Sequence, residues 1–315
     1  MKQTMQRLFF VTALGALIIT SSCKKDDDPV PPPPPPPTPT PSIAAYVTAD
    51  TSFSILLAAV QKAGLATTLS NPGTLTVFAP TNAAFRAAGY SVASINALSA
   101  PDVTNVLTPL LTYHVLGAKV LAAGVPASDT VKTLNGKNLF ASKNANGVFL
   151  NGVRVVSADV PVSNGVIHAI GSVLVPPTQT IAQIVTGNPN FSLLLTAVVR
   201  ANLASTLSGP GKFTVFAPVN SGFPASLDTD AEINAAAVTA VAGIVGSHAF
   251  GTNIFAGDLS AGPTPATVNP LTTLTVALTP PSVKITGSIN AASLITTTNV
   301  VATNGVVHII DKVLQ

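Results

Sequence analysis

The chain has 315 residues, 47% hydrophobic and only 9% charged, so it can bury a large core, and its length suits roughly two domains. Its net charge of +3 gives no electrostatic reason to expect nucleic acid as a partner. The single cysteine, Cys23, lies near the N-terminus, which excludes disulfides and thiolate metal sites from everything that follows it.

Residues 1–22 have the pattern of a secretory signal peptide. Lys2 and Arg7 come first, an apolar run follows at 8–19, and small residues lead up to Cys23. The apolar run is shorter than the about 20 residues that a membrane-spanning helix needs. We therefore expect residues 1–22 to be removed on export, which leaves 13 basic and 12 acidic residues.

The residues around Cys23 predict a lipid anchor. The small residues 20–22 before it resemble a bacterial lipobox, in which the cysteine is acylated and becomes the new N-terminus; a free or buried thiol is the alternative. The charged run 24–28 resembles the export signal of Bacteroidetes-type surface lipoproteins, with a plain solvated tether as the alternative. The proline-rich segment 31–41 predicts a stiff, extended spacer.

An internal repeat organises the remainder of the chain. Residues 53–60 return at 191–198, 76–82 return at 214–220, and 164–168 return at 304–308. The offset is far longer than the 20 to 50 residues of solenoid repeats, so each copy is a domain in its own right. We place a tether at 23–42, a first domain at 43–177 and a second at 178–315.

The first part of each copy predicts an amphipathic helix and then a strand. Apolar residues recur at helical spacing over 53–60 and over 191–198. Gly64 and Asn202 follow these helices, and both residue types tolerate the left-handed conformation of a C-terminal cap. Residues 75–79 then predict a short buried strand that ends at a proline.

The later part of the first copy predicts a longer helix followed by hairpins. The apolar positions of 103–111, Val106 among them, form a helical stripe that extends to His114, and Pro109 should kink or divide this helix. Asn-Gly pairs begin at 135, 146, 151 and 164, and this dipeptide is a strong hairpin signal. We expect each copy to be helical first and then β.

Both copies resemble the fasciclin domain. Residues 76–85 and 213–223 are similar to its first marker motif, and residues 164–174 and 304–314 to its second. The resemblance implies an α+β fold, with two tandem domains that are each a β-wedge of two sheets with packed helices. It also implies a role in cell adhesion. The motif residues expected to be mainly structural are Phe78, Pro80, Asn82, His168, Phe216, Pro218, Asn220 and His308.

The same resemblance suggests a partner-binding position. In animal members a Tyr-His pair between the two motifs takes part in integrin binding; Tyr113-His114 occupies that place here, and Ser247-His248 in the second copy. Tyr113, His114 and His248 are therefore possible partner-binding residues. The alternative for the histidines is a buried, hydrogen-bonded imidazole, and Tyr113 can either pack inward or present a surface anchor.

Chemistry-bearing residues are too sparse for an enzyme. The two copies contain one glutamate, Glu232, scattered aspartates and no Gly-x-Ser-x-Gly elbow. Two histidines per copy and no cysteine are too few for a zinc site. Asn82 and Asn220 are well placed to cap a short helix or tie a turn. We expect no catalytic residues, no metal and no cofactor.

These features predict an adhesion protein held by lipid at the outer membrane, facing the cell exterior, that binds an extracellular protein, matrix or glycan. The main rival is an accessory glycan-binding or nutrient-capture lipoprotein of the outer membrane. The sequence also leaves open a hydrolase, a purely structural envelope component, and an anchor that faces the periplasm.

Overall fold

The computed structural model describes residues 39–269, 274–279, 282–287 and 292–314. The predicted signal peptide, Cys23, the charged run and the polyproline segment lie outside these residues. Each copy is described below by itself.

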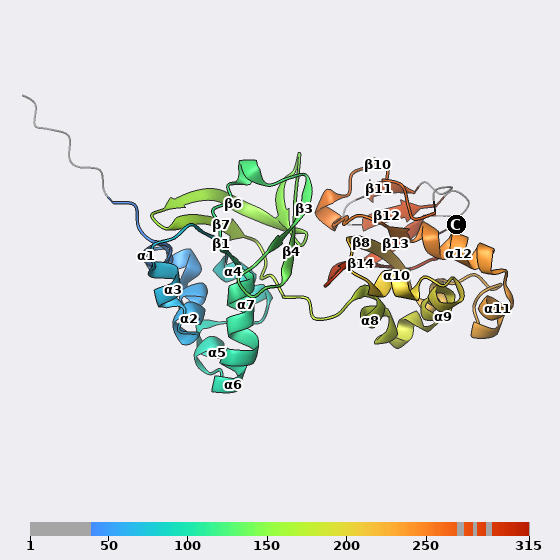
Figure 1. Ribbon diagram of the computed structural model, residues 1–315, viewed down its shortest axis with the longest axis horizontal. Helices are drawn as coiled ribbons and strands as arrows, with labels where there is room; N and C mark the ends of the chain where they lie inside the picture. The colour runs from blue at the N-terminus through green and yellow to red at the C-terminus, as the bar shows by residue number, and fades with distance from the viewer. Residues whose placement is uncertain (1–38, 270–273, 280–281, 288–291, 315) are drawn as a thin grey trace, which may run out of the picture. The chain divides into compact units, whose positions relative to one another are not determined.

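The first copy mixes short helices with seven strands (Figure 1). Its helices are α1 (Ile43–Ala49), α2 (Ser54–Lys62), α3 (Ala66–Ser70), α4 (Asn82–Ala87), α5 (Val92–Asn96), α6 (Ala100–Asp102) and α7 (Thr108–Tyr113), with 3₁₀ turns η1 (Thr51–Phe53) and η3 (Ala122–Gly124) and a π-helical turn η2 (Val103–Leu107). Its strands are β1 (Leu75–Pro80), β2 (Val115–Leu116), β3 (Ser128–Lys132), β4 (Asn138–Asn144), β5 (Gly147–Leu150), β6 (Val153–Val162) and β7 (Gly165–Ile170).

The second copy repeats this plan. Its helices are α8 (Ile181–Thr186), α9 (Ser192–Arg200), α10 (Ala204–Ser208), α11 (Asp230–Ala235) and α12 (Val238–Ser247), with 3₁₀ turns η4 (Pro189–Phe191), η5 (Asn220–Gly222) and η6 (Ala256–Asp258). Its strands are β8 (Phe213–Pro218), β9 (Ala249–Phe250), β10 (Gly262–Pro263), β11 (Thr275–Thr279), β12 (Ser282–Thr286), β13 (Ser293–Ala302) and β14 (Gly305–Ile310).

The described strands of each copy form one curled seven-stranded sheet. The order is β2-β1-β7-β6-β5-β4-β3 in the first copy and β10-β11-β12-β13-β14-β8-β9 in the second. The pairs β1–β7 and β8–β14 are parallel, and the other pairs are antiparallel. The ten-residue β6 pairs with β7 and with β5, so the two halves of the predicted wedge share a strand. The predicted α+β fold is confirmed, and the wedge is one sheet that curls.

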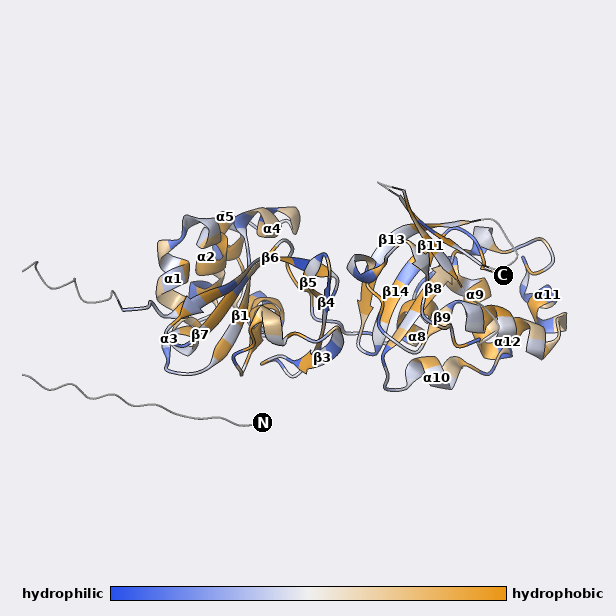
Figure 2. Ribbon diagram, turned by 90° about the horizontal axis from the view of Figure 1, so that it is seen from above, coloured by the Kyte–Doolittle hydropathy of each residue, from blue (hydrophilic) through white to orange (hydrophobic). Residues whose placement is uncertain are grey.

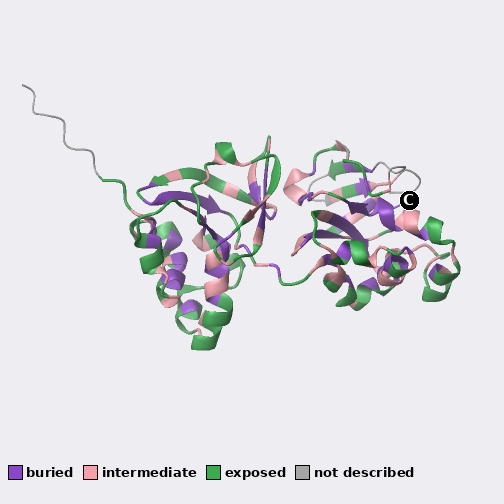
Figure 3. Cartoon of the chain, in the orientation of Figure 1, coloured by how far each residue is buried: buried purple, intermediate pink, exposed green. Residues whose placement is uncertain are grey.

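The curl gives each copy two apolar cores, and alternation along the central strand supplies both. In β1, Val77 packs among the helices with Leu56 and Ile167. Its neighbour Phe78 points to the other face and packs inside the curl with Leu139. Figure 2 shows hydrophobic residues concentrated along β1, and Figure 3 shows the central strands buried and the helices α5, α6 and α11 largely exposed.

Local signals at the helix ends and turns act as the sequence predicts. Gly64 has φ +69° and Asn202 has φ +57°, so both adopt the left-handed conformation after α2 and α9. The four Asn-Gly pairs lie at the turns that join β3, β4, β5, β6 and β7 in succession. The order of elements is less simple than helices first and strands later, because β1 lies between helices in the chain and pairs with β7.

The helix predicted over 103–111 is divided, and the prediction that all of its apolar stripe is buried is wrong at one position. It forms the π turn η2 and the first part of α7, with α6 just before it and Pro109 in the first turn of α7. The side chain of Val106 is 51% exposed, although the periodic pattern places it in the core. A π turn holds more residues than an α turn, so it rotates Val106 off the buried face.

No helix in the described parts of the chain is by itself long and apolar enough to cross a membrane. The segments 43–49 and 51–62 are long and apolar enough only when they are taken together, and the two are bent by 100° relative to each other. Both contribute residues to the core of the first copy.

Candidate functional site

Two of the four histidines join the end of a helix to the end of their own copy. The Nδ1–H of His114 donates to the carbonyl of Leu110 at 2.7 Å, and its Nε2 accepts from the amide of Leu174 at 2.9 Å. His248 repeats this with Ile244 at 2.8 Å and with the amide of Leu314 at 2.8 Å. Both rings are buried and neutral, with each nitrogen engaged by the backbone.

The other two histidines join the last strand to the loop after β2 or β9. In the first copy, His168 donates from Nε2 to the carbonyl of Val120 at 2.8 Å and accepts at Nδ1 from the amide of Asp159 at 3.2 Å. In the second copy, His308 donates to the carbonyl of Ile254 at 2.8 Å and accepts from the amide of Asn299 at 3.4 Å.

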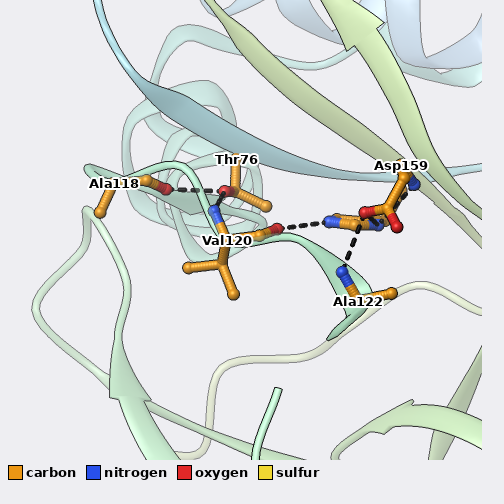
Figure 4. A network of polar contacts seen from close by, with 6 residues as sticks. Thr76, Ala118, Val120, Ala122 and Asp159 are labelled. Atoms are coloured by element: carbon orange, nitrogen blue, oxygen red, sulfur yellow. Dashed lines mark hydrogen bonds and ion pairs between the residues drawn. The ribbon is translucent and has the colours of Figure 1, made fainter. Parts of the chain in front are cut away.

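Side chains on either side complete this network in the first copy (Figure 4). The hydroxyl of Thr76 donates to the carbonyl of Ala118 at 2.6 Å and accepts from the amide of Val120 at 2.8 Å. The carboxylate of Asp159 accepts from the amide of Ala122 at 2.9 Å. Asp159 has φ +60°, which aspartate tolerates better than most residues. The network thus pins an irregular loop to the sheet.

The motif phenylalanines pack on these histidines. The rings of Phe78 and His168 stack with centroids 5.7 Å apart, and those of Phe216 and His308 with centroids 5.1 Å apart. All four rings are buried. They therefore belong to the fold and offer no side-chain surface to a partner.

Burial also sets the protonation of three histidines. It lowers the pKa of His114, His248 and His308 to about 4 in each case, against a smaller opposing effect of the backbone carbonyl that each ring contacts. In each neutral ring, one nitrogen accepts a hydrogen bond from a backbone N–H. Protonation would place the ring's second N–H on that nitrogen, pointing at the backbone donor. These rings stay neutral at physiological pH.

The motif asparagines hold chain segments that lie far apart in the sequence. Asn82 accepts from the amide of Ile55 at 3.0 Å and donates to the carbonyl of Thr51 at 2.8 Å and the hydroxyl of Ser54 at 3.0 Å. Asn220 makes the equivalent bonds in the second copy. The cap of the helix that follows is Thr81, so Asn82 ties the turn at the start of α2 and does not cap its own helix.

A second pair of asparagines acts in the same way. Asn164 accepts from the amide of Ile43 at 2.9 Å and donates to the carbonyls of Leu69 and Asn71. Asn304 does so in the second copy. The sequence places both in hairpin turns but gives no sign of these long-range bonds, and it likewise gives no sign of the role of Thr76.

The motif prolines end strands at no cost in hydrogen bonds. The amide of Phe78, two residues before Pro80, points to the β2 side and donates to the carbonyl of His114 at 2.9 Å. The nitrogen of Pro80 faces the same side, where β2 pairs only with residues 76 and 77. Pro218 occupies the same place in β8.

Tyr113 packs inward. Its side chain is 0% exposed, and its hydroxyl donates to the carbonyl of Asn138 at 2.8 Å and accepts from the side-chain amide of Asn151 at 2.8 Å. Burial raises its pKa to about 12, although the bond from Asn151 acts in the opposite direction. Partner contact through Tyr113, His114 and His248 does not fit their burial, because none of the three presents its side chain to solvent.

The backbone engages the ring nitrogens of all four histidines. Within the part of the chain that the structure describes, no three His, Cys, Asp or Glu residues gather as a metal site. The nearest acid–histidine pair is Asp159–His168, with Oδ1 and Nδ1 4.0 Å apart, and that ring nitrogen already accepts an amide. The clusters hold backbone segments in place.

Comparisons with known proteins identify the family of the two copies. The fasciclin domain family matches residues 51–176 and 189–315. Protein sll1483 of Synechocystis is 43% identical over 126 residues, which are 40% of this chain and 68% of that protein. The transforming growth factor-beta-induced protein ig-h3 of Sus scrofa is 38% identical over 130 residues, which are 41% of this chain but only 18% of ig-h3.

A solved structure of a fasciclin domain pair is also similar. It comes from the insect cell adhesion molecule fasciclin I, with 18% identity, a TM-score of 0.39, and coverage of 82% of this chain and 92% of that one.

Proposed function

Because the chain belongs to the fasciclin domain family, we propose that it is a cell-surface adhesion protein that binds extracellular protein, matrix or glycan through its two domains. One observation carries the proposal. The polar side chains that recur in both copies, the motif histidines and asparagines, make their hydrogen bonds inside their own domain, so binding would use the outer surfaces.

Two linked domains suit adhesion physically. Once one domain is bound, the other meets its ligand at an effective concentration set by the short link between them, so two weak sites add up to firm attachment. A binding role also accords with the engaged ring nitrogens of all four histidines. We include in the proposal that the chain is not an enzyme.

The proposal extends to the anchor and the location. Residues 1–22 would direct export, Cys23 would carry lipid in the outer membrane, and residues 24–41 would lift the domains away from the cell. A single acyl chain binds a membrane only weakly, so stable anchoring needs the several chains of a bacterial lipoprotein. The sequence pattern around Cys23 is the support for this part.

Two experiments test the proposal. Protease shaving of intact cells should remove the protein, whereas Cys23→Ala should release it from the membrane fraction. Deletion of the protein should reduce attachment to a matrix-coated surface, and the full chain should restore it. Unchanged attachment after deletion, with co-purification of an outer-membrane transporter, would replace adhesion by nutrient capture.

A further inference from the structure

The first copy carries an open groove of about 570 Å³ beside the π turn. Its lining includes Tyr90, Asn105, Val106, Thr108, Lys137 and Val175, all inside the first fasciclin match. The volume lies within the range of about 300–1,000 Å³ of small-molecule sites. None of the four histidines lines it, and neither do the motif asparagines Asn82 and Asn164.

The π turn shapes one wall of this groove. The amide of Thr108 bonds back to the carbonyl of Val103, five residues earlier, and Pro109 follows without an amide hydrogen. Gly243 takes the place of Pro109 in the second copy, five residues before the buried histidine, and α12 is continuous there. The turn leaves Val106 51% exposed in the groove. Such π turns are frequent at functional sites.

The two copies share their internal hydrogen bonds but differ at this groove. Helices α5 and α11 begin with the same kind of capping box, and the residue before the cap is Tyr90 in the first copy but Asp228 in the second. Just before the proline and its glycine counterpart stand Thr108 and Ala242. The aromatic ring and this hydroxyl therefore belong to the first copy alone.

The two copies also differ in net charge. Residues 43–177 contain seven basic and four acidic residues, whereas 178–315 contain four basic and five acidic ones. Among the described residues that line the groove, Lys137 is charged and none is acidic. In the second copy Asp228 lies beside Glu232, and the pKa of Asp228 is raised mainly by its hydrogen bond to that carboxylate. An anionic ligand is thus favoured in the first copy and repelled at the matching place in the second.

The lining suits a sugar acid. Tyr90 is half-buried and its ring meets that of Phe85 edge-on, with centroids 6.2 Å apart, which holds it as a firm apolar platform. Asn105 and Thr108 supply an amide and a hydroxyl for sugar hydroxyls, and the ammonium of Lys137 can pair with a carboxylate. A peptide that adds to a sheet would need backbone partners from a strand edge, and the groove is lined by helical turns and loops without a strand residue.

We propose that this groove is a binding site for an acidic polysaccharide segment rich in uronic acid. The inference rests on the proposed adhesion function and names the ligand class and the domain that takes it. Binding would be reversible and weakened by salt, because one part of it is a charge pair at the surface.

The test is binding of the full chain to a tetramer of galacturonic acid, followed by calorimetry, with a tetramer of galactose as the neutral control. We expect saturable binding of the acidic tetramer and at least about tenfold weaker binding of the neutral one. Lys137→Ala should weaken acidic binding about tenfold. Lys119→Ala removes the same charge from an exposed site of the same domain outside the groove, and should change affinity less than about twofold.

Thr108→Ala removes the side-chain hydroxyl but keeps the backbone amide that closes the π turn, and alanine is a good helix former. It should weaken the acidic tetramer about threefold while leaving the unfolding midpoint within error. No saturable binding, equal losses from the two lysine variants, or equal binding of the neutral tetramer would overturn the inference. If cells still attach through the full chain when the tetramer does not bind, the inference fails and adhesion stands.

Discussion

Acidification should destabilise the second copy more than the first. Burial lowers the pKa of His114 in the first copy and of both His248 and His308 in the second to about 4, from an ordinary 6.5. Between pH 6.5 and pH 4, these histidines are protonated in the unfolded chain but stay neutral in the folded one. Stability is therefore complete above pH 6.5 and is lost as the pH falls toward 4.

The magnitude follows from the two pKa values. At pH 5, each such ring costs about 2 kcal/mol of the free energy of unfolding, and the full loss below pH 4 is about 3.4 kcal/mol per ring. The first copy thus loses about 2 kcal/mol from this source at pH 5 and the second about 4 kcal/mol, out of a total of roughly 5–15 kcal/mol for a typical domain.

Hydrogen exchange read by mass spectrometry can separate the copies. Amides of β1 and β7 report the first copy and those of β8 and β14 the second, in urea series at pH 7 and pH 5. His248→Gln is the control: it lowers stability at pH 7 but should remove about half of the second copy's loss between the two pH values. Equal losses in both copies, or a second copy indifferent to pH, would refute the reasoning.

Three substitutions probe single contacts. Asn82→Ala should cost about 1–3 kcal/mol in urea denaturation and speed exchange at the start of α2, with Asn220→Ala doing the same to α9, because three hydrogen bonds are lost at each. Gly165→Ala should lower the free energy of unfolding by more than about 3 kcal/mol, because Gly165 has φ +157° and a Cβ there would run into the carbonyl of Leu75. Gly124→Ala is the control: a Cβ there meets nothing within 4 Å, so the free energy of unfolding should change by less than about 0.5 kcal/mol. Tyr113→Phe should cost about 1 kcal/mol and leave cell attachment unchanged, whereas reduced attachment by a folded variant would contradict its structural role.

Local features of the fold are predictable because their causes are local. The stripe of α2 and the left-handed residues after α2 and α9 depend on neighbours within a turn or two. The hairpin turns follow from the Asn-Gly dipeptide itself. The motif resemblance adds the α+β class, which no local pattern provides.

Long-range features escape the sequence pattern. The parallel pairing of β1 with β7 joins residues about ninety positions apart, such as Val77 with Ile167. The bonds from Asn82 to the start of α2 depend on that same assembly. Pro109 predicts a break in its helix. Packing decides that the break is a π turn, and this turn exposes Val106.

The repeat itself separates what folds the chain from what the chain can bind. The residues that recur between copies, such as His168 with His308 and Asn82 with Asn220, have their polar atoms satisfied within their own domain. Even the exchange of Asp159 for Asn299 keeps the left-handed backbone and the amide contact. Selection for the fold acts on both copies alike, so it explains the recurring residues and leaves the others free. The proposed difference in ligand between the copies therefore requires surface positions that do not recur.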